Sequence, residues 1–458
     1  MRVVIVGASG FLGRALAEAF AHRGVELLCT ARDAGAARAR ASWPQAHTEW
    51  ISADFAQVPP ASFWAHHLRR GDVVVNAAGV LRERHAGEFE AVHHQGPVQL
   101  FDACVEAGAA LVIQVSALGA TPYAVSGYHR SKGEADRHLR HCRVASAIVQ
   151  PSLVWGDEGA SAGLFAALAV MPLLALPGGG RQAVQPVHLD DVVAGVLALA
   201  EARPARSRTI AFVGPEPVSF RGYLADLRAQ LGYAREAWVL PIPEGLFRFG
   251  AMLAGRFKSS FLDTDTAGML LRGNAAPADD LAQWLGHAPR SHRTFVPAHR
   301  AEALRRASWL QWMLPLLRVS VALVWIWTFA VSIGLYPRDQ SLALLARVGA
   351  SGAWAEMLLD GAALFDLALG IGTLLLPAAW RARVLWPLQL ALIAFYTAAI
   401  SWAMPEFWLH PFGPLSKNLP MCAAIALLWA MEPPVRRGRH PAPNARQPAE
   451  KPPWNTSS

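Results

Sequence analysis

Four long apolar stretches in the C-terminal third limit the folds open to this chain of 458 residues. Each is close to the ~20 residues that an α-helix needs to cross the hydrocarbon core of a bilayer. Soluble helices of this length carry a polar stripe, and a soluble bundle is therefore the weaker alternative. Only 17% of the residues are charged, against roughly 25% in ordinary soluble domains. We predict four membrane spans, at Val319–Tyr336, Met357–Leu376, Val384–Met404 and Phe412–Met431.

The distribution of basic residues predicts how these spans are oriented. The net charge is +8, and arginines precede the first span, separate the second from the third, and follow the fourth. The positive-inside rule places such segments in the cytoplasm. A basic chain can also bind nucleic acid, but the clustering beside the spans favours membrane lipid as the partner. We expect an integral protein of a bacterial-type cytoplasmic membrane, with four spans, both termini and the N-terminal domain cytoplasmic, and no nucleic-acid partner.

The first 214 residues have a different pattern, in which short β-rich runs alternate with amphipathic helical stretches. Such alternation predicts right-handed βαβ crossovers and an α/β fold with a parallel, doubly wound sheet. The predicted strands are Val3–Val6, Val25–Thr30, Glu49–Ala53, Val73–Asn76, Leu111–Ser116, Ala145–Gln150 and Thr209–Val213.

The region between this domain and the first span is predicted to form a smaller, mainly helical lobe over residues 215–298 that completes a substrate cleft. Ser219 is expected to cap one helix, and Pro241 and Pro243 to break the chain before another. The apolar run Leu164–Leu176 is interpreted as a core helix, since it is too short for a comfortable span. Residues 299–318 are predicted as a basic juxtamembrane linker, 319–432 as an all-α membrane domain with four helices, and 433–458 as a disordered tail.

The strongest local motif is the glycine-rich turn after the first predicted strand. Its glycines permit a tight turn and close approach of a pyrophosphate, whose charge is favoured at a helix N-terminus. A simple tight turn is the alternative, but the strand–turn–helix context at the start of the chain favours a dinucleotide. The residues predicted to contact it are Gly7, Ser9, Gly10, Phe11, Leu12 and Gly13.

Residues that end the next strands are predicted to complete the cofactor site. Arg32 follows the second strand, where an arginine accommodates a ribose 2′-phosphate, although the adjacent Asp33 makes the preference mixed. We therefore favour NADP(H) over NAD(H). Asp54 is placed to reach an adenine or to cap a helix. The small residues that let backbone pass the cofactor are Asn76, Ala77, Ala78 and Gly79.

Ser116, Tyr128 and Lys132 form the candidate catalytic set. Tyr128 and Lys132 are four residues apart and share one face of a predicted helix. We expect the nearby ammonium to lower the pKa of the phenol, which would then exchange a proton with a substrate oxygen. Ser116 ends the fifth strand and is expected to hydrogen-bond that oxygen.

Together these motifs resemble the short-chain dehydrogenase/reductase (SDR) superfamily. The segments at 151–156 and 185–192 are similar to its atypical extended branch, which includes the dinucleotide-binding accessory subunit of respiratory complex I. The resemblance covers about residues 1–295. It implies a Rossmann fold, a nicotinamide cofactor also contacted by Tyr128, Lys132 and Pro151, Tyr128 as acid/base, Lys132 as its activator and Ser116 as substrate stabiliser. His94 and Gln95 occupy the neighbourhood of the superfamily's catalytic Asn.

The C-terminal region, about 305–432, resembles DoxX-like four-helix membrane domains through the segment 410–418. Asp360 and Asp366 lie at predicted membrane depth, where a carboxylate is costly unless it is buried or paired. Asp366 is the better functional candidate, with pairing to Lys417 or to a backbone group as the structural alternative. His410 lacks a second ligand at helical spacing, and the four cysteines are too far apart in the sequence for a disulfide framework or a zinc site, so no metal is predicted.

These observations predict a membrane-anchored NAD(P)-dependent oxidoreductase or epimerase that acts on a carbonyl or alcohol substrate. Membrane anchoring makes a lipophilic substrate, such as a quinone or lipid, plausible. The alternative is a non-catalytic NADP(H)-binding scaffold or redox-sensing subunit of a membrane complex.

Overall fold

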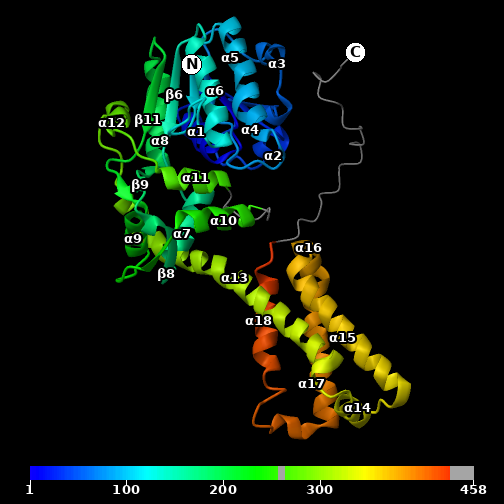
Figure 1. Cartoon of the computed structure of the whole chain (residues 1–458). Helices are drawn as coiled ribbons and strands as arrows, with labels where there is room; N and C mark the ends of the chain where they lie inside the picture. The colour runs from blue at the N-terminus through cyan, green and yellow to red at the C-terminus, as the bar shows by residue number, and fades with distance from the viewer. Residues whose placement is uncertain (256–263, 434–458) are drawn as a thin grey trace, which may run out of the picture. The chain divides into compact units, whose positions relative to one another are not determined.

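The computed structural model describes residues 1–255 and 264–433 (Figure 1). It divides into two compact units, the first running from Met1 to Ser308 and the second beginning at Trp309. The predicted boundaries at 214 and 298 fall inside the first unit. The predicted disordered tail lies outside the described residues, apart from Pro433.

The first unit is built on a parallel sheet of seven strands in the order β11-β6-β5-β4-β1-β2-β3. The chain winds outward from β1 in one direction and from β4 in the other, so the strand order reverses between these two. This confirms the predicted doubly wound sheet, and each predicted strand lies within one residue of an observed one. The strands are β1 (Arg2–Val6), β2 (Glu26–Ala31), β3 (Thr48–Ser52), β4 (Val73–Asn76), β5 (Leu111–Val115), β6 (Ser146–Pro151) and β11 (Arg208–Phe212).

Helices cover both faces of the sheet, which explains why its central strands are apolar at most positions. Val3 and Ile5 of β1 enter one core, and Val4 and Val6 enter the core on the opposite face. The first core is closed by α1 (Phe11–His22), α8 (Leu189–Ala202) and α12 (Asp279–Leu285). The second is closed by α3 (Ala61–Ala65), α5 (Gly96–Ala107) and α6 (Gly127–His141). Shorter helices α2 (Ala34–Arg38) and α4 (Glu88–Glu90) lie in the connections.

In the structure the smaller lobe also includes segments between residues 154 and 188, and it contains strands that the sequence did not predict. The run Leu164–Leu176 was predicted as one helix, and this is wrong for its second half, because Pro172 cannot continue the helix. That half instead forms β8 (Leu173–Pro177), which pairs in parallel with β13 (Trp238–Ile242). Ser219 caps α9 as predicted, since its Oγ accepts from Gly222 N at 3.1 Å. The other elements are α7 (Ala160–Ala169), α9 (Phe220–Gln230), α10 (Glu244–Ala254), α11 (Thr264–Arg272) and the two-residue strands β7 (Val154–Trp155), β9 (Ala183–Val184), β10 (Val187–His188) and β12 (Val218–Ser219).

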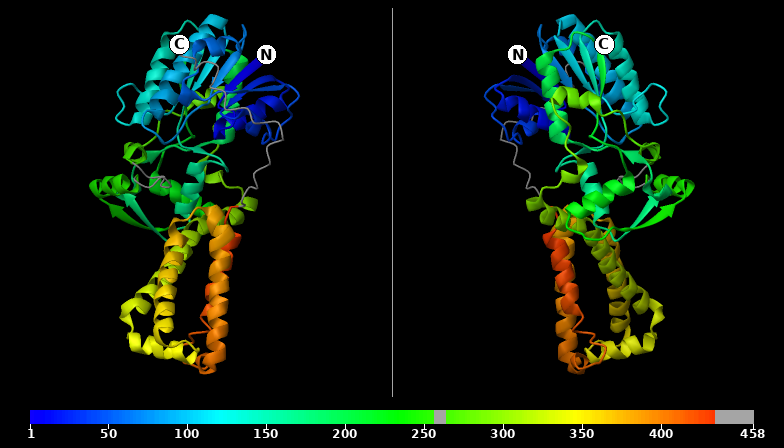
Figure 2. Two further views of the ribbon diagram at one scale, coloured as in Figure 1. Left: turned by 90° about the vertical axis from the view of Figure 1, so that its right-hand side faces the viewer. Right: turned by 90° about the vertical axis from the view of Figure 1, so that its left-hand side faces the viewer.

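The second unit is helical, and its long helices run side by side in both views of Figure 2. Three helical segments among the described residues are long and apolar enough to cross a membrane: Ala298–Leu335, Gly352–Leu375 and Ala378–Ala403. They correspond to the first three predicted spans, each of which ends one residue beyond its helical segment. The helices are α13 (Ala298–Ala330), α14 (Arg338–Arg347), α15 (Gly352–Leu375), α16 (Ala378–Trp380), α17 (Trp386–Ala403) and α18 (Asn418–Ala430).

The fourth predicted span differs from the structure. Only α18 forms there, with 13 residues, which corresponds to about 20 Å of helix. The hydrocarbon core of a bilayer is about 30 Å thick. The structure therefore provides three helices of spanning length, and the fourth span stays a prediction.

A buried ion pair holds one end of the second unit together. The Glu432 side chain is 2% exposed and accepts from Arg381 Nε at 2.6 Å and from Arg381 Nη2 at 3.1 Å. The indole of Trp386 also donates to Glu432, at 3.3 Å. The short segment at Glu432, just after α18, is thereby fixed to the start of α17.

Candidate functional site

The glycine-rich turn between β1 and α1 is shaped by the close approach of backbone to backbone. Gly7 has φ +80°, and a Cβ there would lie 2.9 Å from the backbone N and Cα of Ala78. A Cβ on Gly13 would lie 2.2 Å from Gly7 O. Both positions therefore require glycine for packing within the protein. The turn is tied to β2, because Ala8 N donates to Thr30 O at 2.9 Å.

The outer side of the same turn is open, as a phosphate site requires. Ser9 and Gly10 are exposed. Gly10 occupies the N-cap position of α1, and no side chain caps that helix terminus. The first backbone amides of α1, from Phe11 to Gly13, thus point out of the helix without a side-chain acceptor. These residues fit the pyrophosphate of a dinucleotide, because its negative charge would be stabilised there.

The segment after β4 brings small residues against this turn. Ala77 and Ala78 are the backbone that Gly7 meets, and Gly79 follows. Asn76 is fully buried and satisfied within the protein: its Nδ2 donates to Gln114 Oε1 at 2.7 Å, and its Oδ1 accepts from Ala78 N at 3.2 Å. Asn76 therefore shapes the segment, and its side chain is not free for a ligand.

The predicted residues after β2 and β3 have two different roles: Arg32 is exposed, whereas Asp33 and Asp54 cap helices. Asp33 Oδ1 accepts from Ala36 N at 2.8 Å and caps α2. Asp54 Oδ1 likewise accepts from Ala56 N at 3.1 Å, which is the capping role weighed as the alternative to adenine contact. Arg32 is exposed, and no ion pair is recorded for it in the described part of the chain. Arg32 and Asp33 gave opposite indications of cofactor preference. The structure explains this, because the Asp33 carboxylate caps α2.

Tyr128 and Lys132 lie together on α6, with the Lys132 Nζ 5.6 Å from the centre of the phenol ring. Lys132 donates to Val115 O at 3.0 Å, at the carboxyl end of β5. A Cβ on Gly79 would lie 3.6 Å from Lys132 Nζ, so the ammonium lies against the predicted cofactor segment. The structure thus brings these predicted residues together at one edge of the sheet.

The electrostatics of this pair differ from our prediction. Burial raises the pKa of Tyr128 to about 12, so the prediction that the ammonium lowers it is wrong for this structure. Burial also lowers the pKa of Lys132 to about 8, and the charge of Asp136 partly offsets that effect. Desolvation dominates because Lys132 is buried and Tyr128 is only partly exposed.

Ser116 has a partner that the sequence did not reveal. Its hydroxyl donates to Asp136 Oδ2 at 2.5 Å, and both side chains are buried. Burial raises the pKa of Asp136 to about 6, against the opposing effects of the Ser116 hydrogen bond and the Lys132 charge. The hydrogen that we expected Ser116 to offer to a substrate is therefore held by a carboxylate one helical turn after Lys132.

His93 is a second residue that sequence reasoning missed. It lies in a π-helical segment (Ala91–Gln95) and is 1% exposed. Its Nε2 accepts from Val80 N at 3.0 Å, and its Nδ1 lies 3.2 Å from Ser131 Oγ. The ring is stacked on Phe89 and meets the Tyr128 ring edge-on, with centroids 5.2 Å apart. Burial, and secondarily the charge of Lys132, lowers the pKa of His93 well below its ordinary value, so it is neutral.

The two residues predicted for that neighbourhood point elsewhere. His94 is partly exposed and pairs with Glu90 at 2.6 Å, and Gln95 is exposed. His94 and Gln95, which stand in the sequence neighbourhood of the superfamily's catalytic Asn, are therefore directed away from Tyr128, and His93 is the residue that meets it.

The smaller lobe reaches the loop after β5 through one arginine. Arg272 of α11 lies 3.3 Å from Leu118 O, 3.4 Å from Gly119 O and 3.1 Å from His129 Nε2. Pro151 lies at the end of β6, and its carbonyl accepts from Leu118 N at 3.1 Å. The loop that borders the candidate site is thus held from both sides.

All four cysteines are free thiols. Cys142 nevertheless lies near two other potential metal ligands, Asp102 and His138, with the ligand atoms within 4.8 Å of one another. A direct His138–Asp102 contact of 2.7 Å already pairs two of the three. We assign no metal to this partly exposed group.

The two predicted membrane carboxylates have different environments. Asp360 is partly exposed and forms a two-point ion pair with Arg338, at 2.8 and 2.9 Å. Asp366 is 4% exposed, and its Oδ1 lacks a hydrogen-bond partner among the described residues. Among the described residues, Asp366 forms no ion pair with Lys417, so the structural alternative of that pairing is not supported.

Comparison with known proteins defines two domains that agree with this geometry. Residues 3–213 match the NAD dependent epimerase/dehydratase family, and residues 322–426 match the DoxX-like family. The chain therefore combines an epimerase- and SDR-like domain of Rossmann fold with a DoxX-like membrane domain.

Individual relatives refine this assignment. The chain is 28% identical over 219 residues to subunit 9 of the NADH dehydrogenase [ubiquinone] 1 alpha subcomplex of Mus musculus, covering 46% of this chain and 56% of the relative. It is 30% identical over 199 residues to a ceramide reductase of Caulobacter vibrioides, covering 43% of this chain and 60% of the relative. The chain thus spans somewhat more than half the length of these relatives.

Solved structures support the fold. MoeE5 in complex with UDP-glucose and NAD aligns with a TM-score of 0.50 at 18% identity, covering 67% of this chain and 99% of that one. A UDP-glucuronic acid 4-epimerase variant from Bacillus cereus aligns with a TM-score of 0.51 at 15% identity, with the same coverage. At these identities the likeness establishes the fold alone.

Proposed function

We propose that this chain is a membrane-anchored, NADP(H)-dependent oxidoreductase or epimerase that acts on a carbonyl or alcohol carbon of a lipophilic substrate. The observation that carries the proposal is the placement of Tyr128 and Lys132. They lie on one helix at the carboxyl end of β5, with the Lys132 ammonium against Gly79. The cofactor supplies or accepts a hydride when it is bound, and the side chains described here handle the proton.

Tyr128 is the proposed acid/base. Because burial raises its pKa to about 12, the phenol is protonated at neutral pH. A protonated phenol is suited to donate to the oxygen of a carbonyl as that oxygen gains negative charge. The protonated phenol is the form that carbonyl reduction requires.

Lys132 is proposed to stabilise the phenolate that remains after this donation. Its pKa of about 8 keeps most of the population charged at pH 7. Val115 O holds the ammonium in place. Ser116 is assigned a positioning role, since its hydroxyl binds Asp136, whose charge favours the charged form of Lys132.

The preference for NADP(H) is proposed from Arg32 and Asp33. Asp33 is used as a helix cap, and Arg32 is exposed, so a 2′-phosphate would meet a guanidinium. The aligned solved structures named above contain NAD, so the proposed preference for NADP(H) would be a difference between this chain and those proteins.

A lipophilic substrate is proposed from the membrane domain and from one relative. The epimerase-like domain is joined to a membrane domain in a single chain. The relative from Caulobacter vibrioides is named a ceramide reductase, a name that specifies reduction and a lipid. A quinone remains the other candidate class.

Turnover of the full chain in detergent, with NADPH and a panel of long-chain ketones and quinones, tests this proposal. Tyr128→Phe keeps the ring contacts with Phe89 and His93 and removes the proton. We expect it to bind NADPH like the wild type and to lose at least about 100-fold in kcat, the lower range for a general acid. Unchanged kcat would refute the catalytic role.

One observation favours the second candidate function, a non-catalytic scaffold or redox sensor. The Ser116 hydroxyl is occupied by Asp136, and among the relatives is an accessory subunit of a respiratory complex. In that case Tyr128→Phe would preserve the biological activity of the protein, whereas a variant that no longer binds cofactor would abolish it.

A further inference from the structure

The smaller lobe carries an apolar face that its own fold leaves uncovered. Helix α10 exposes four large apolar side chains, spaced i, i+3, i+6 and i+7, which places them on one side of the helix. The two charged residues of the helix, Glu244 and Arg248, lie outside this apolar side, and Ala251 is the buried residue of this helix. The exposed fractions are 60% for Leu246, 54% for Phe249, 43% for Met252 and 39% for Leu253.

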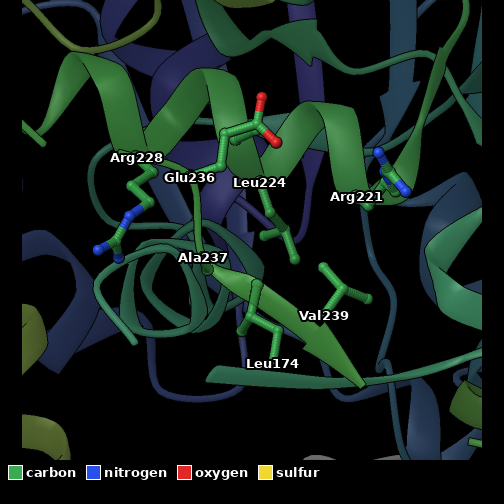
Figure 3. Close-up of a pocket in the computed structure, with 8 residues that line it drawn as sticks. Leu174, Arg221, Leu224, Arg228, Glu236, Ala237 and Val239 are labelled. Atoms are coloured by element: carbon green, nitrogen blue, oxygen red, sulfur yellow. The ribbon is translucent and has the colours of Figure 1, made fainter. Parts of the chain in front are cut away.

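The strand that leads into α10 extends this face. In β13, Trp238 is 81% exposed and Leu240 is 55% exposed, while Leu173, opposite Trp238 on β8, is 57% exposed. Side chains alternate between the faces of a strand. Figure 3 shows that the intervening residues, Leu174 and Val239, line a pocket against α9. The ribbon thus buries one face and presents a second, apolar face to its surroundings.

The lobe directly precedes the first membrane segment in the sequence, which makes the membrane the candidate for covering this face. Arg305 of α13 lies 3.4 Å from Leu231 O, which ties the end of α9 to α13. Exposed apolar side chains on α13 begin at Trp312, seven residues further on, or about 10 Å of helix. The lobe is therefore tied to α13 in the part of that helix that precedes its large exposed apolar side chains.

The charge around the face suits an anionic bilayer. Basic side chains near such a surface are attracted to anionic lipid headgroups, and tryptophan is favoured at the boundary between headgroups and acyl chains. On the lobe segments that carry or adjoin the face, the exposed charged residues are Arg181, Arg235 and Arg248 against Glu244. Arg221 and Glu236 line the pocket on the opposite face.

We propose that α10 and the outer face of the β8–β13 ribbon insert into the surface of the membrane in which the chain is anchored. The lobe then contacts lipid directly, in the manner of an interfacial amphipathic helix. This contact with lipid is independent of turnover by the proposed enzyme.

Site-specific labelling of the full chain tests this placement. Cys29 and Cys104 are fully buried, so replacing Cys142 and Cys422 by Ser gives a background for labelling. An environment-sensitive fluorophore is attached at Phe249→Cys on the apolar side of α10, or at Arg248→Cys as the matched control. The protein is reconstituted in nanodiscs that contain anionic lipid, and quenching by spin-labelled lipid is compared with quenching by a soluble quencher.

We expect lipid quenching at position 249 to exceed that at 248 severalfold, with the soluble quencher giving the opposite order. Equal access of the soluble quencher to both positions would overturn the proposal. Shielding of position 249 from both quenchers would also overturn it, because another part of the chain or a second copy would then cover the face. Adding Tyr128→Phe leaves the quenching unchanged, so failure of the enzymatic proposal is distinguishable from failure of this one.

Discussion

Replacing Asp136 by Asn should move the pH dependence of the reaction without touching any group that exchanges a proton with substrate. Asp136 follows Lys132 by one turn of α6 and raises its pKa against the dominant effect of burial. Removing the carboxylate charge should therefore lower the pKa of Lys132 below about 8. The ammonium is present below that pKa and lost above it, so the basic limb of the rate profile should shift to lower pH.

The size of the shift depends on the helical spacing. Residues four apart on a helix have Cβ atoms about 5–6 Å apart. Two unit charges about 6 Å apart attract by about 0.7 to 3 kcal/mol for an effective dielectric constant between about 80 and 20. Since about 1.4 kcal/mol corresponds to one pKa unit, the expected shift is about half to two pH units.

The assay is kcat/KM for carbonyl reduction measured across pH, which reports the groups of the free enzyme. Asp102→Asn is the matched control, because it removes a carboxylate from the neighbouring helix α5 that pairs with His138. Ser116→Ala removes the hydrogen bond to Asp136 but leaves the carboxyl group in place, so its basic limb should shift less than that of Asp136→Asn. Coincident basic limbs for Asp136→Asn and the wild type would show that the charge of Lys132 does not depend on Asp136, and would refute this reasoning.

Three other variants test separate parts of the structure. Arg32→Ala should raise the Kd for NADPH about tenfold or more through loss of a charge-assisted hydrogen bond, while the Kd for NADH stays unchanged. Arg38→Ala, which removes an exposed arginine on α2, is the control. Equal losses of affinity for both cofactors would contradict the assignment. Gly13→Ala should abolish cofactor binding and lower the Tm, because its Cβ would lie 2.2 Å from a backbone oxygen, whereas Gly245→Ala, where an added Cβ meets nothing within 4 Å, should leave both unchanged. Glu432→Gln leaves a nearly buried guanidinium without its charged partner and should cost about 3–5 kcal/mol; thermal unfolding in detergent measures this, and an unchanged Tm would exclude a stabilising role.

The sheet could be predicted from the sequence because its strands carry their own signal. Strands buried on both faces read as short apolar runs between turn residues, and β4 is found at its predicted bounds, Val73–Asn76. The ribbon β8–β13 lacks such a signal. Pro172, Pro241 and Pro243 indicate breaks, and the pairing joins Leu173 to Trp238 across more than sixty residues. No local pattern encodes a contact of that kind.

The same limit applies to Ser116. Its place at the end of β5 is a local property that the sequence indicates. Its hydrogen bond depends on Asp136, which appears in the sequence only as one more charged residue on a polar helix. The role that we first expected for Ser116 assumed a free hydroxyl, and only the packing of α6 on β5 shows that a buried carboxylate holds it.

The helix register before α5 explains why His93 was missed. An α-helical period advances each residue by about 100°, and it is this period that places neighbours on a face. The segment Ala91–Gln95 is π-helical, which adds a residue to the turn and shifts the register of α4 against that of α5. His93 is thereby turned toward Tyr128, while His94 reaches Glu90 on the outer side. Single π-helical turns occur frequently at functional sites. The π-helical turn therefore points to the same edge of the sheet as the functional site. This indication comes from backbone geometry and does not depend on a sequence motif.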